Sequence, residues 1–279
     1  MKVFPFQIPK PTNDALIYQE DHEFEFYNQL HQHEEIQLSC IVKGEGTLLV
    51  GDSLHSYQSG DVFAIGGNLP HVFLSASGSA EKSVMYSLFF TKESFGEHFF
   101  DLEELQSTKG FFRTIDNGFQ ALSKTKNLVN QFLSLQSKSR LQRFVSLLEI
   151  VEILSKSKKR NLSNQLFKKR FSTHEGQRMR DVMDYTFSNY QNEIRIDTIS
   201  DIAHMTTNAF CKYFKKRTNK TYNQFLNELR IEKACQLLLI KDKLVSEIAF
   251  ETGFPNLSNF NRKFKNIKSV TPSKFRNSN

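Results

Sequence analysis

The sequence of 279 residues contains no tryptophan, only three cysteines and six prolines, and no long hydrophobic run. No segment approaches the ~18 apolar residues that a membrane helix needs, and the start, MKVFPFQIPKPTND, lacks the apolar stretch of a signal peptide. Cys40, Cys211 and Cys235 are odd in number, far apart and in no CxxC pair, which argues against a disulfide framework and a structural zinc site. We therefore expect an intracellular, cytoplasmic protein with reduced cysteines.

Length and charge indicate two domains with different surfaces. At about 100–200 residues per domain, this length suits two compact units, and 24% charged residues with 39% hydrophobic residues exclude a disordered or collagen-like chain. From Gly176 onward there are 18 Lys and Arg against 10 Asp and Glu, whereas the first 175 residues hold 19 against 20. We predict domains at 1–155 and 176–279, the second suited to a polyanionic partner. A solvated basic linker, 156–175, is predicted between them from seven basic residues: Lys156, Lys158, Lys159, Arg160, Lys168, Lys169 and Arg170.

Short β-rich runs separated by Gly turns fill the chain from Glu34 to Phe90. Strands this short, with no helical period between them, are typical of an antiparallel barrel or sandwich, and a small barrel can enclose one ligand. The predicted strands are 36–42, 47–50, 54–57, 62–65, 71–74 and 84–90.

One set of polar residues in this region has a distinctive spacing, His31-x-His33-x3-Gln37-x6-Gly44, then Gly60-x10-His71. The pattern resembles the two motifs of the cupin barrel, in which two His, a Glu and a later His converge on a metal. The resemblance implies a site for an effector or a metal at His31, His33, Gln37 and His71. Gln37 replaces the expected carboxylate and is a weaker ligand. The alternative is that these histidines line the barrel rim or close a turn.

Apolar residues at helical spacing follow the strands and predict helices near 117–135 and 139–156. The second is apolar over more than the ~100° stripe that one contact requires, so we expect it to bury against the barrel and also against the same helix of a second subunit. The alternative is that both helices pack only on their own barrel. The residues assigned to this stripe are Leu141, Phe144, Val145, Leu148, Val151 and Leu154.

The last hundred residues contain a weak internal repeat with a period near 50. Ile199-Ser200 corresponds to Ile248-Ala249, His204-Met205 to Gly253-Phe254, and Phe210 to Phe260. Each copy reads as helix, tight turn, helix: Gly253 or His204 ends the first helix, and Asn256 or Thr206 caps the second. A single helix is predicted between the copies, over 222–241, about 30 Å long.

On the second helix of each copy, apolar residues four apart face the core, and amides, hydroxyls and cations face outward. Such an outer face can read base edges and hold phosphates. A merely solvated face is the alternative for one helix, but two such helices in a domain of net charge +8 favour DNA. The ~30 Å helix approximates the ~34 Å between successive major grooves. From their outward placement, we predict that Lys215 and Lys265 contact phosphates.

The stretch MTTNAFCKYFKKRTNKTYNQFLNELRIEKACQLL and the later GF-x4-NFNR-x-FK with TP-x2-FR resemble the double helix-turn-helix domain of AraC-type transcriptional regulators. Arg195, Leu244 and Ser200 depart from the family pattern, in which Ser, Thr or Pro opens the first helix and Ala follows inside it. The resemblance implies a small effector, often a sugar, bound by the barrel, and a dimer formed by the helices after it. By position it implies these base-reading residues: Asn208, Cys211, Lys212, Leu257, Ser258, Asn261 and Arg262.

We therefore predict an α+β protein, with an N-terminal antiparallel β-barrel resembling cupins, two following helices, and a C-terminal all-α domain of two helix-turn-helix units. It would be a non-enzymatic, sequence-specific transcription regulator that needs no cofactor and whose partners are double-stranded DNA, a small sugar-like effector, a second copy of itself and RNA polymerase. The alternatives are a cupin metalloenzyme carrying a DNA-binding module, and an architectural DNA-binding protein with an inert barrel. Gln37 argues against the enzyme, because catalytic iron or manganese sites usually need a carboxylate or a complete His set.

Overall fold

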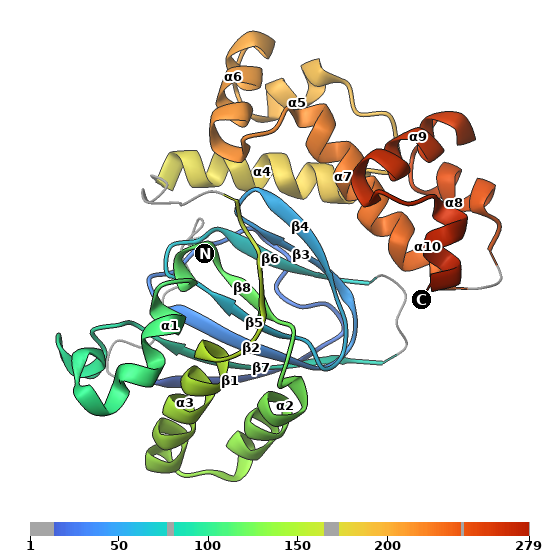
Figure 1. Ribbon diagram of the computed structural model, residues 1–279. Helices are drawn as coiled ribbons and strands as arrows, with labels where there is room; N and C mark the ends of the chain where they lie inside the picture. Colours follow the sequence, from blue (N-terminus) through green and yellow to red (C-terminus); the bar gives the residue numbers. More distant parts are fainter. Residues whose placement is uncertain (1–13, 77–80, 165–172, 241–242, 279) are drawn as a thin grey trace. The chain divides into compact units, whose positions relative to one another are not determined.

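The computed structural model describes residues 14–76, 81–164, 173–240 and 243–278, and the chain divides into two compact units (Figure 1). The sheet unit comprises residues 1–53 and 57–171, and the helical unit comprises 54–56 and 172–279. None of the described helices has both the length and the apolar character needed to cross a membrane.

In its described residues, the sheet unit contains two antiparallel sheets. One has six strands in the order β1-β7-β2-β5-β8-β9, and the other has three in the order β4-β3-β6. All six strands predicted from the sequence are confirmed, whereas β1, β8 and β9 were not predicted. The strands are β1 Ile17–Glu23, β2 Ile36–Lys43, β3 Gly46–Val50, β4 Ser53–Tyr57, β5 Val62–Ile65, β6 His71–Ser75, β7 Ser83–Phe90, β8 Phe119–Ala121 and β9 Lys159–Asn161.

Alternating side chains of the six-stranded sheet enter two separate cores. From β2, Ile41 packs with Leu48 of β3 and Phe73 of β6 in the core that joins the two sheets. Its neighbours Leu38 and Cys40 point the other way, into a core shared with the helices that follow. The sheet is therefore covered on both faces, which explains why its central strands read as nearly continuous apolar runs.

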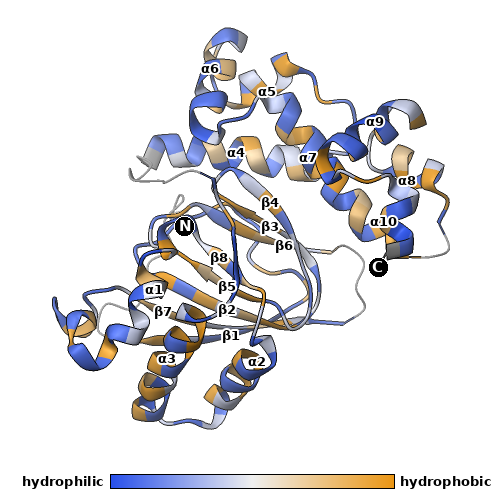
Figure 2. Cartoon of the chain, in the orientation of Figure 1, coloured by the Kyte–Doolittle hydropathy of each residue, from blue (hydrophilic) through white to orange (hydrophobic). Residues whose placement is uncertain are grey.

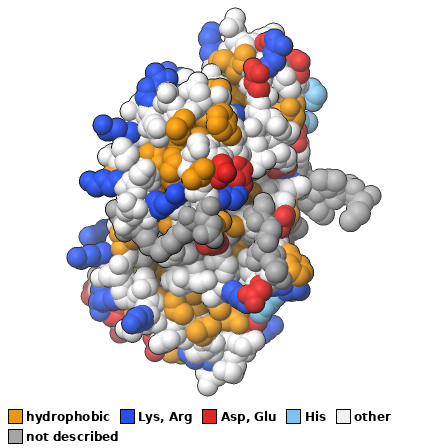
Figure 3. Space-filling view, turned by 90° about the vertical axis from the view of Figure 1, so that its right-hand side faces the viewer, with side chains coloured by type: hydrophobic (Ala, Val, Ile, Leu, Met, Phe, Trp, Pro, Cys, Tyr) orange, Lys and Arg blue, Asp and Glu red, His pale blue; other side chains and the backbone are white. Residues whose placement is uncertain are grey.

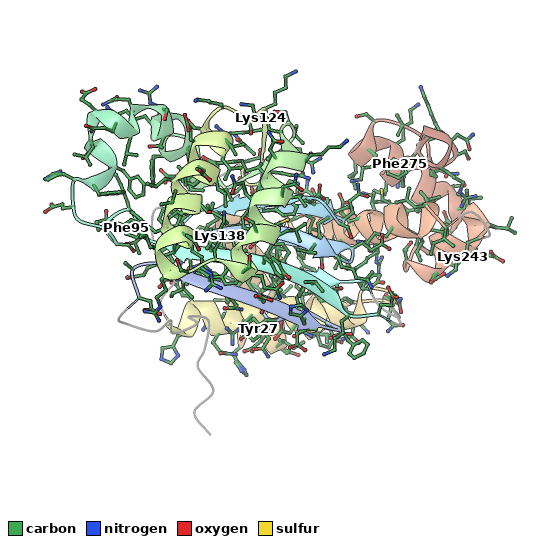
Figure 4. The ribbon with its side chains drawn as sticks, turned by 90° about the horizontal axis from the view of Figure 1, so that it is seen from below. Tyr27, Phe95, Lys124, Lys138, Lys243 and Phe275 are labelled. Atoms are coloured by element: carbon green, nitrogen blue, oxygen red, sulfur yellow. The ribbon has the colours of Figure 1, made fainter. Side chains whose placement is uncertain are left out.

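Two helices, α2 Thr125–Ser134 and α3 Arg140–Ser155, lie side by side across one face of the sheet (Figures 1 and 4). Smaller elements precede them: η1 Phe99–Asp101, η2 Glu103–Thr108, α1 Lys109–Phe112 and η3 Ile115–Asn117, with η4 Leu135–Ser137 between α2 and α3. The prediction of one helix near 117–135 was wrong in its first part. Phe119 and Ala121 belong to a strand there, because β8 adds to the sheet edge beside β5.

The predicted apolar stripe of α3 is also corrected. Val151 and Leu154 are fully buried in the unit's own core, together with Leu147 and Ile150. Only Leu141 and Val145 are strongly exposed, at 71% and 48%. Much of the excess apolar surface that suggested a subunit contact therefore covers the sheet.

The predicted linker is partly a component of the sheet. Lys159 and Arg160 lie in β9, which pairs with β8, and Leu162 and Ser163 are buried. Ser163 donates to the carboxylate of Asp52, at 3.0 Å. The linker prediction was wrong here because the main chain of this basic segment hydrogen-bonds to a sheet edge, and Lys159 Nζ donates to Ser155 O over the ring of Phe119, while Arg160 stays exposed. Three other basic residues of the predicted linker, Lys168, Lys169 and Arg170, lie outside the described residues.

The helical unit contains two helix-turn-helix pairs joined by a central helix. Its helices are α4 Thr173–Asn189, α5 Ile196–Ile202, α6 Thr207–Thr218, α7 Tyr222–Leu238, α8 Val245–Glu251, α9 Leu257–Lys268 and α10 Pro272–Ser278. Figure 2 shows apolar residues along α7, against which α6, α8, α9 and α10 pack, while α5 packs with α4 and α6. The predicted extension of α7 to 241 was wrong, since the helix ends at Leu238 and the next two residues are half exposed.

Candidate DNA-binding surface and effector pocket

The turn of each helix-turn-helix pair has the same backbone hydrogen bonds. His204 N–H donates to Asp201 O and Met205 N–H to Ser200 O, at 2.9 and 3.0 Å. In the second pair, Gly253 N–H donates to Phe250 O and Phe254 N–H to Ala249 O, at the same two distances. This is the Schellman pattern that ends a helix through one residue in the left-handed region. The predicted repeat is thus confirmed at its turns.

The second helix of each pair begins at the predicted cap. Thr206 Oγ1 accepts from Ala209 N–H, and Asn256 Oδ1 accepts from Asn259 N–H. Arg195 and Leu244, at the starts of α5 and α8, make no side-chain cap bond. Ser200, which stands where the second copy has Ala249, is buried and donates its hydroxyl to Asp197 O at 2.8 Å. The hydroxyl is therefore accommodated without an unmade hydrogen bond.

The two helices α6 and α9 each bury one face and expose the other. Phe210 and Phe214 of α6 and Phe260 and Phe264 of α9 are all fully buried. On the surface, Lys and Arg side chains are interspersed with apolar patches (Figure 3). Every residue predicted to contact DNA is exposed: Asn208, Cys211, Lys212 and Lys215 on α6, and Leu257, Ser258, Asn261, Arg262 and Lys265 on α9.

Contacts with α4 hold α6 in place. The hydroxyl of Tyr213 donates to the main-chain oxygen of Glu175 at 3.0 Å, and Arg217 pairs with the Glu175 carboxylate. Burial raises the pKa of Tyr213 to about 12, so this phenol stays a hydrogen-bond donor at neutral pH. Because both anchors lie on the inner side of α6, the outward face keeps a fixed orientation.

Arg230 of α7 connects the two pairs. Its guanidinium donates to Tyr190 O and Asn192 O, at 2.7 and 2.8 Å, which anchors the segment leading into α5. The same guanidinium lies over the ring of Phe254, the residue after the turn of the second pair, at 5.8 Å. One buried cation thus joins both helix-turn-helix pairs to the central helix.

In the sheet unit, the four residues of the predicted effector or metal site come together. His31, His33 and His71 are buried, and one ring nitrogen from each lies within 4.8 Å of the other two. Gln37 Oε1 is 3.1 Å from His33 Nε2 and 3.0 Å from His71 Nε2. All three rings are buried, and His71 Nδ1 also bonds to Leu69 O across Pro70, at 2.8 Å, which is the turn-closing contact that the alternative expected.

A pocket opens beside the histidines. Its polar wall includes residues that the sequence analysis missed, because β1 reads IYQEDHE and has no apolar alternation. The apolar wall comes from aromatic side chains and one methionine. The lining residues are Gln19, Asp21, Glu23, Phe26, Tyr27, His31, His33, Gln37, Phe73, Met85 and Phe89.

All three cysteines are free. Burial raises the pKa of the Cys40 and Cys235 thiols to about 12, so both stay protonated and unreactive at neutral pH. Cys211 is exposed on α6.

Comparison with known proteins agrees with this geometry. A helix-turn-helix domain family matches residues 199–278, which run from inside α5 to the end of α10. The chain carries an AraC-type helix-turn-helix domain. On α6, Lys216 is exposed like its neighbour Lys215.

The similarity to known proteins extends beyond the AraC-type domain. The chain is 23% identical over 261 residues to an uncharacterized HTH-type transcriptional regulator, YdeC, of Bacillus subtilis, covering 91% of this chain and 87% of that protein. It is 22% identical over 248 residues to the HTH-type transcriptional activator RhaS of Pectobacterium carotovorum, covering 88% and 86%. Among solved structures, an AraC-type transcriptional regulator from Chromobacterium violaceum is 21% identical with a TM-score of 0.35, covering 36% of this chain and 90% of that one.

Proposed function

We propose that this DNA-binding AraC-type transcription regulator reads two successive major grooves with α6 and α9, under the control of a small effector bound in the sheet unit. The observation that carries the DNA-binding part is the repeated arrangement of the two helices. Each follows a Schellman turn, buries two Phe and presents amides, hydroxyls and cations outward. These outward groups match the hydrogen-bonding needs of base edges and phosphates.

The central helix supports the two-groove arrangement. The rings of Phe210 and Phe214 pack against Tyr222 at the start of α7, whereas Phe260 and Phe264 pack with Cys235 and Leu238 at its end. The 17 residues of α7 span about 25 Å, which is of the order of the ~34 Å between successive major grooves. Arg230 then fixes the two pairs against this helix.

We assign direct base contacts to Asn208, Cys211 and Lys212 on α6, and to Leu257, Ser258, Asn261 and Arg262 on α9. Arg262 has the strongest chemistry for this role, since a guanidinium can donate two hydrogen bonds to guanine. Leu257, 37% exposed at the first turn of α9, suits a thymine methyl group. Lys215 and Lys265 lie one turn further along each helix, where we assign them to phosphates.

The pocket beside β1 supports the effector part of the proposal. It combines aromatic faces from Phe26, Tyr27 and Phe73 with the polar groups of Gln19 and Asp21. Aromatic rings that pack on a carbon skeleton, together with carboxylate and amide groups that bind hydroxyls, suit a sugar-like metabolite. The sheet unit would then be the sensing part of the regulator.

We also propose that the protein is a homodimer that uses the exposed part of α3. Leu141 and Val145 lie four residues apart on one helix face, and partly buried Leu148 continues that face. The proposed partner at this face is a second copy of the chain. The two copies of the α3 face would contact each other about a two-fold axis, as in a symmetric dimer.

The full-length chain tests the proposal in two steps. First, binding sites are selected from random duplexes and footprinted with hydroxyl radicals. For each subunit, two protected segments on one DNA face, about 10–10.5 base pairs apart, are expected, so a dimer should protect two such pairs. One protected segment would contradict the two-groove arrangement, and absence of sequence preference would support an architectural role instead. Second, a thermal-shift screen against sugars and other metabolites should find a ligand that also changes DNA affinity. If no sugar or other metabolite shifts the melting temperature, the sensing role is contradicted.

A further inference from the structure

We propose that a cleft between the two helix-turn-helix pairs holds the DNA strand that crosses from one major groove to the next, mainly through uncharged amide groups. The proposal rests on the proposed two-groove arrangement and adds contacts between α6 and α9. The cleft is bounded by the segment before α5, the first half of α7, the turn between α8 and α9, and the first turn of α9. Its polar lining residues are Gln191, Glu193, Asn223, Asn227, Arg230 and Asn259.

The cleft lies where DNA would pass between the two grooves. Asn259 directly follows Ser258 in the first turn of α9, so one wall of the cleft borders a residue assigned to bases. Another wall begins at Asn223, next to Tyr222, on which the two buried Phe of α6 pack. On one face of B-DNA, the minor groove and its two strands lie between successive major grooves. A DNA strand therefore faces the cleft when α6 and α9 are both in place.

One face of α7 supplies two amides to the cleft. Asn223, Asn227 and Arg230 are spaced at i, i+4 and i+7, so their side chains leave the helix on the same side. The exposed Asn223 side chain makes no hydrogen bond within the part of the chain that the structure describes. Asn227 donates one amide hydrogen to Asn223 O, at 2.6 Å, and keeps a second. Amides of this kind commonly donate to phosphate oxygens.

The buried floor of the cleft attracts an anion. Arg230 is 9% exposed, and its guanidinium donates to two main-chain carbonyls, Tyr190 O and Asn192 O. Within the described residues it forms no ion pair, although buried charges are normally paired. The carbonyls satisfy its N–H groups but leave its positive charge in place. A phosphate at the mouth of the cleft would be drawn toward this charge.

The cleft differs in charge from the outward faces of α6 and α9. Those faces carry Lys and Arg, whereas the exposed polar residues of the cleft are amides and one carboxylate, Glu193. Neutral donors do not replace counterions on the phosphates, so their contribution to affinity does not depend on salt. Glu193 opposes the approach of a phosphate. The cleft therefore predicts effects on DNA binding that differ from those of the lysines.

The test measures the DNA affinity of the full-length chain for its selected binding site. Asn223→Asp should weaken binding by about tenfold or more, because it places a carboxylate against a phosphate. An acidic residue in the first turn stabilises a helix, so this variant should fold as well as the wild type. Asn277→Asp on α10 is the matched control, since Asn277 is also exposed but lies outside the cleft.

Two further variants are measured at several salt concentrations. Asn223→Ala should weaken binding about two- to tenfold at each concentration, with the salt dependence and the preferred sequence unchanged, because it removes one neutral hydrogen bond. Glu193→Gln should tighten binding about two- to fivefold, because an exposed carboxylate repels a nearby phosphate only weakly through water. A loosened fold would not tighten binding, so this variant separates repulsion from a structural role.

Neutral methylphosphonates, placed one at a time between the protected segments, locate the contacted phosphate. At one position, Asn223→Asp should bind within about threefold of the wild type on the same duplex, because the repulsion is removed there. If no position reduces the difference between the two proteins, the proposal is wrong.

Equal weakening by Asn223→Asp and Asn277→Asp would overturn the proposal, because net charge alone would then explain the loss. Unchanged DNA affinity in Asn223→Asp would also overturn it, and would favour an acidic protein partner in the cleft. The wild-type footprint separates this failure from that of the proposed function. One protected segment per subunit rejects the two-groove arrangement and the cleft contact with it. Two protected segments per subunit, with an unaffected Asn223→Asp, reject the cleft contact alone.

Discussion

His204 and Gly253 occupy the same place in the two helix-turn-helix turns, and both have positive φ, +51° and +86°. Their surroundings differ. His204 is exposed, whereas a Cβ atom at Gly253 would lie 2.6 Å from Tyr190 O and 2.8 Å from Gln191 O. The first turn therefore tolerates a side chain that the second excludes.

Opposite effects on stability are expected at these two positions. His204→Gly should stabilise the protein by a few tenths to about 1 kcal/mol, because glycine adopts positive φ without strain. Gly253→Ala should destabilise it by about 2–3 kcal/mol through strain and close contact with main-chain oxygens. Urea unfolding of the two variants measures both changes. A cost of Gly253→Ala no larger than the gain of His204→Gly would show that φ alone decides the outcome.

Leu244→Ser should stabilise α8. Leu244 is 63% exposed at the N-cap and makes no side-chain cap bond, while Glu247 already accepts from Leu244 N–H at 2.8 Å. A serine would complete this half-formed capping box, for a gain of about 0.5–1 kcal/mol. Leu244→Ala serves as the control, since it removes the same apolar side chain without adding a cap. If the Leu244→Ser variant is no more stable than the Leu244→Ala variant in thermal unfolding, the prediction is wrong.

Asp184 of α4 should make stability fall as pH rises between about 4 and 6. Burial raises the pKa of Asp184 to about 6, because it outweighs the lowering effect of Arg180, and the nearby Asp181 adds a smaller raising effect. In the unfolded chain the pKa of an Asp is about 3.9. Between pH 4 and pH 6 the folded state therefore binds more protons than the unfolded state. The stabilisation is thus fully present below about pH 4 and is lost as pH passes 6.

Asp184→Asn removes this titration. Two pKa units correspond to about 2.7 kcal/mol, but the carboxyl is only partly buried, so about 1 kcal/mol is expected after solvent screening. The variant should therefore be more stable than the wild type at pH 7 by about 1 kcal/mol and show a flatter profile from pH 4 to 6. Unfolding free energies measured at several pH values check this. If the free energy of unfolding of Asp184→Asn changes with pH as steeply as that of the wild type, other groups cause the pH dependence.

Dimerisation is tested by Leu141→Glu and Val145→Glu, which place charges on the exposed face of α3. Both should give folded monomers, because neither side chain contributes to the buried core of the sheet unit. Leu133→Glu on α2 is the matched control, since Leu133 is 44% exposed and lies outside the proposed contact. The measurement is size-exclusion light scattering at tens of micromolar. A wild-type protein that is monomeric with and without DNA would disprove the dimer.

Local signals in the sequence predicted the parts of the fold that local contacts determine. The Gly-containing turns were sufficient to predict six strands, and the capping residues Thr206 and Asn256 were sufficient to predict the starts of α6 and α9. Long-range pairing determined the rest. β1 is polar and gains its strand conformation from pairing with β7, and β8 and β9 are three-residue strands that depend on the sheet edge. The resemblance to the cupin motifs implied that the histidines lie together, but the acidic wall of the pocket depends on β1.

Binding-site selection with single variants of α9 tests the central claim, that this helix reads bases, most directly. Arg262→Ala should cost about 1–3 kcal/mol of DNA binding and relax the preference at one base pair. Lys265→Ala should weaken all sequences about equally and reduce the salt dependence by about one counterion. The two exposed cations lie three residues apart on α9, so each variant controls for the charge lost in the other. Wild-type affinity and unchanged base preference in Arg262→Ala would contradict the account.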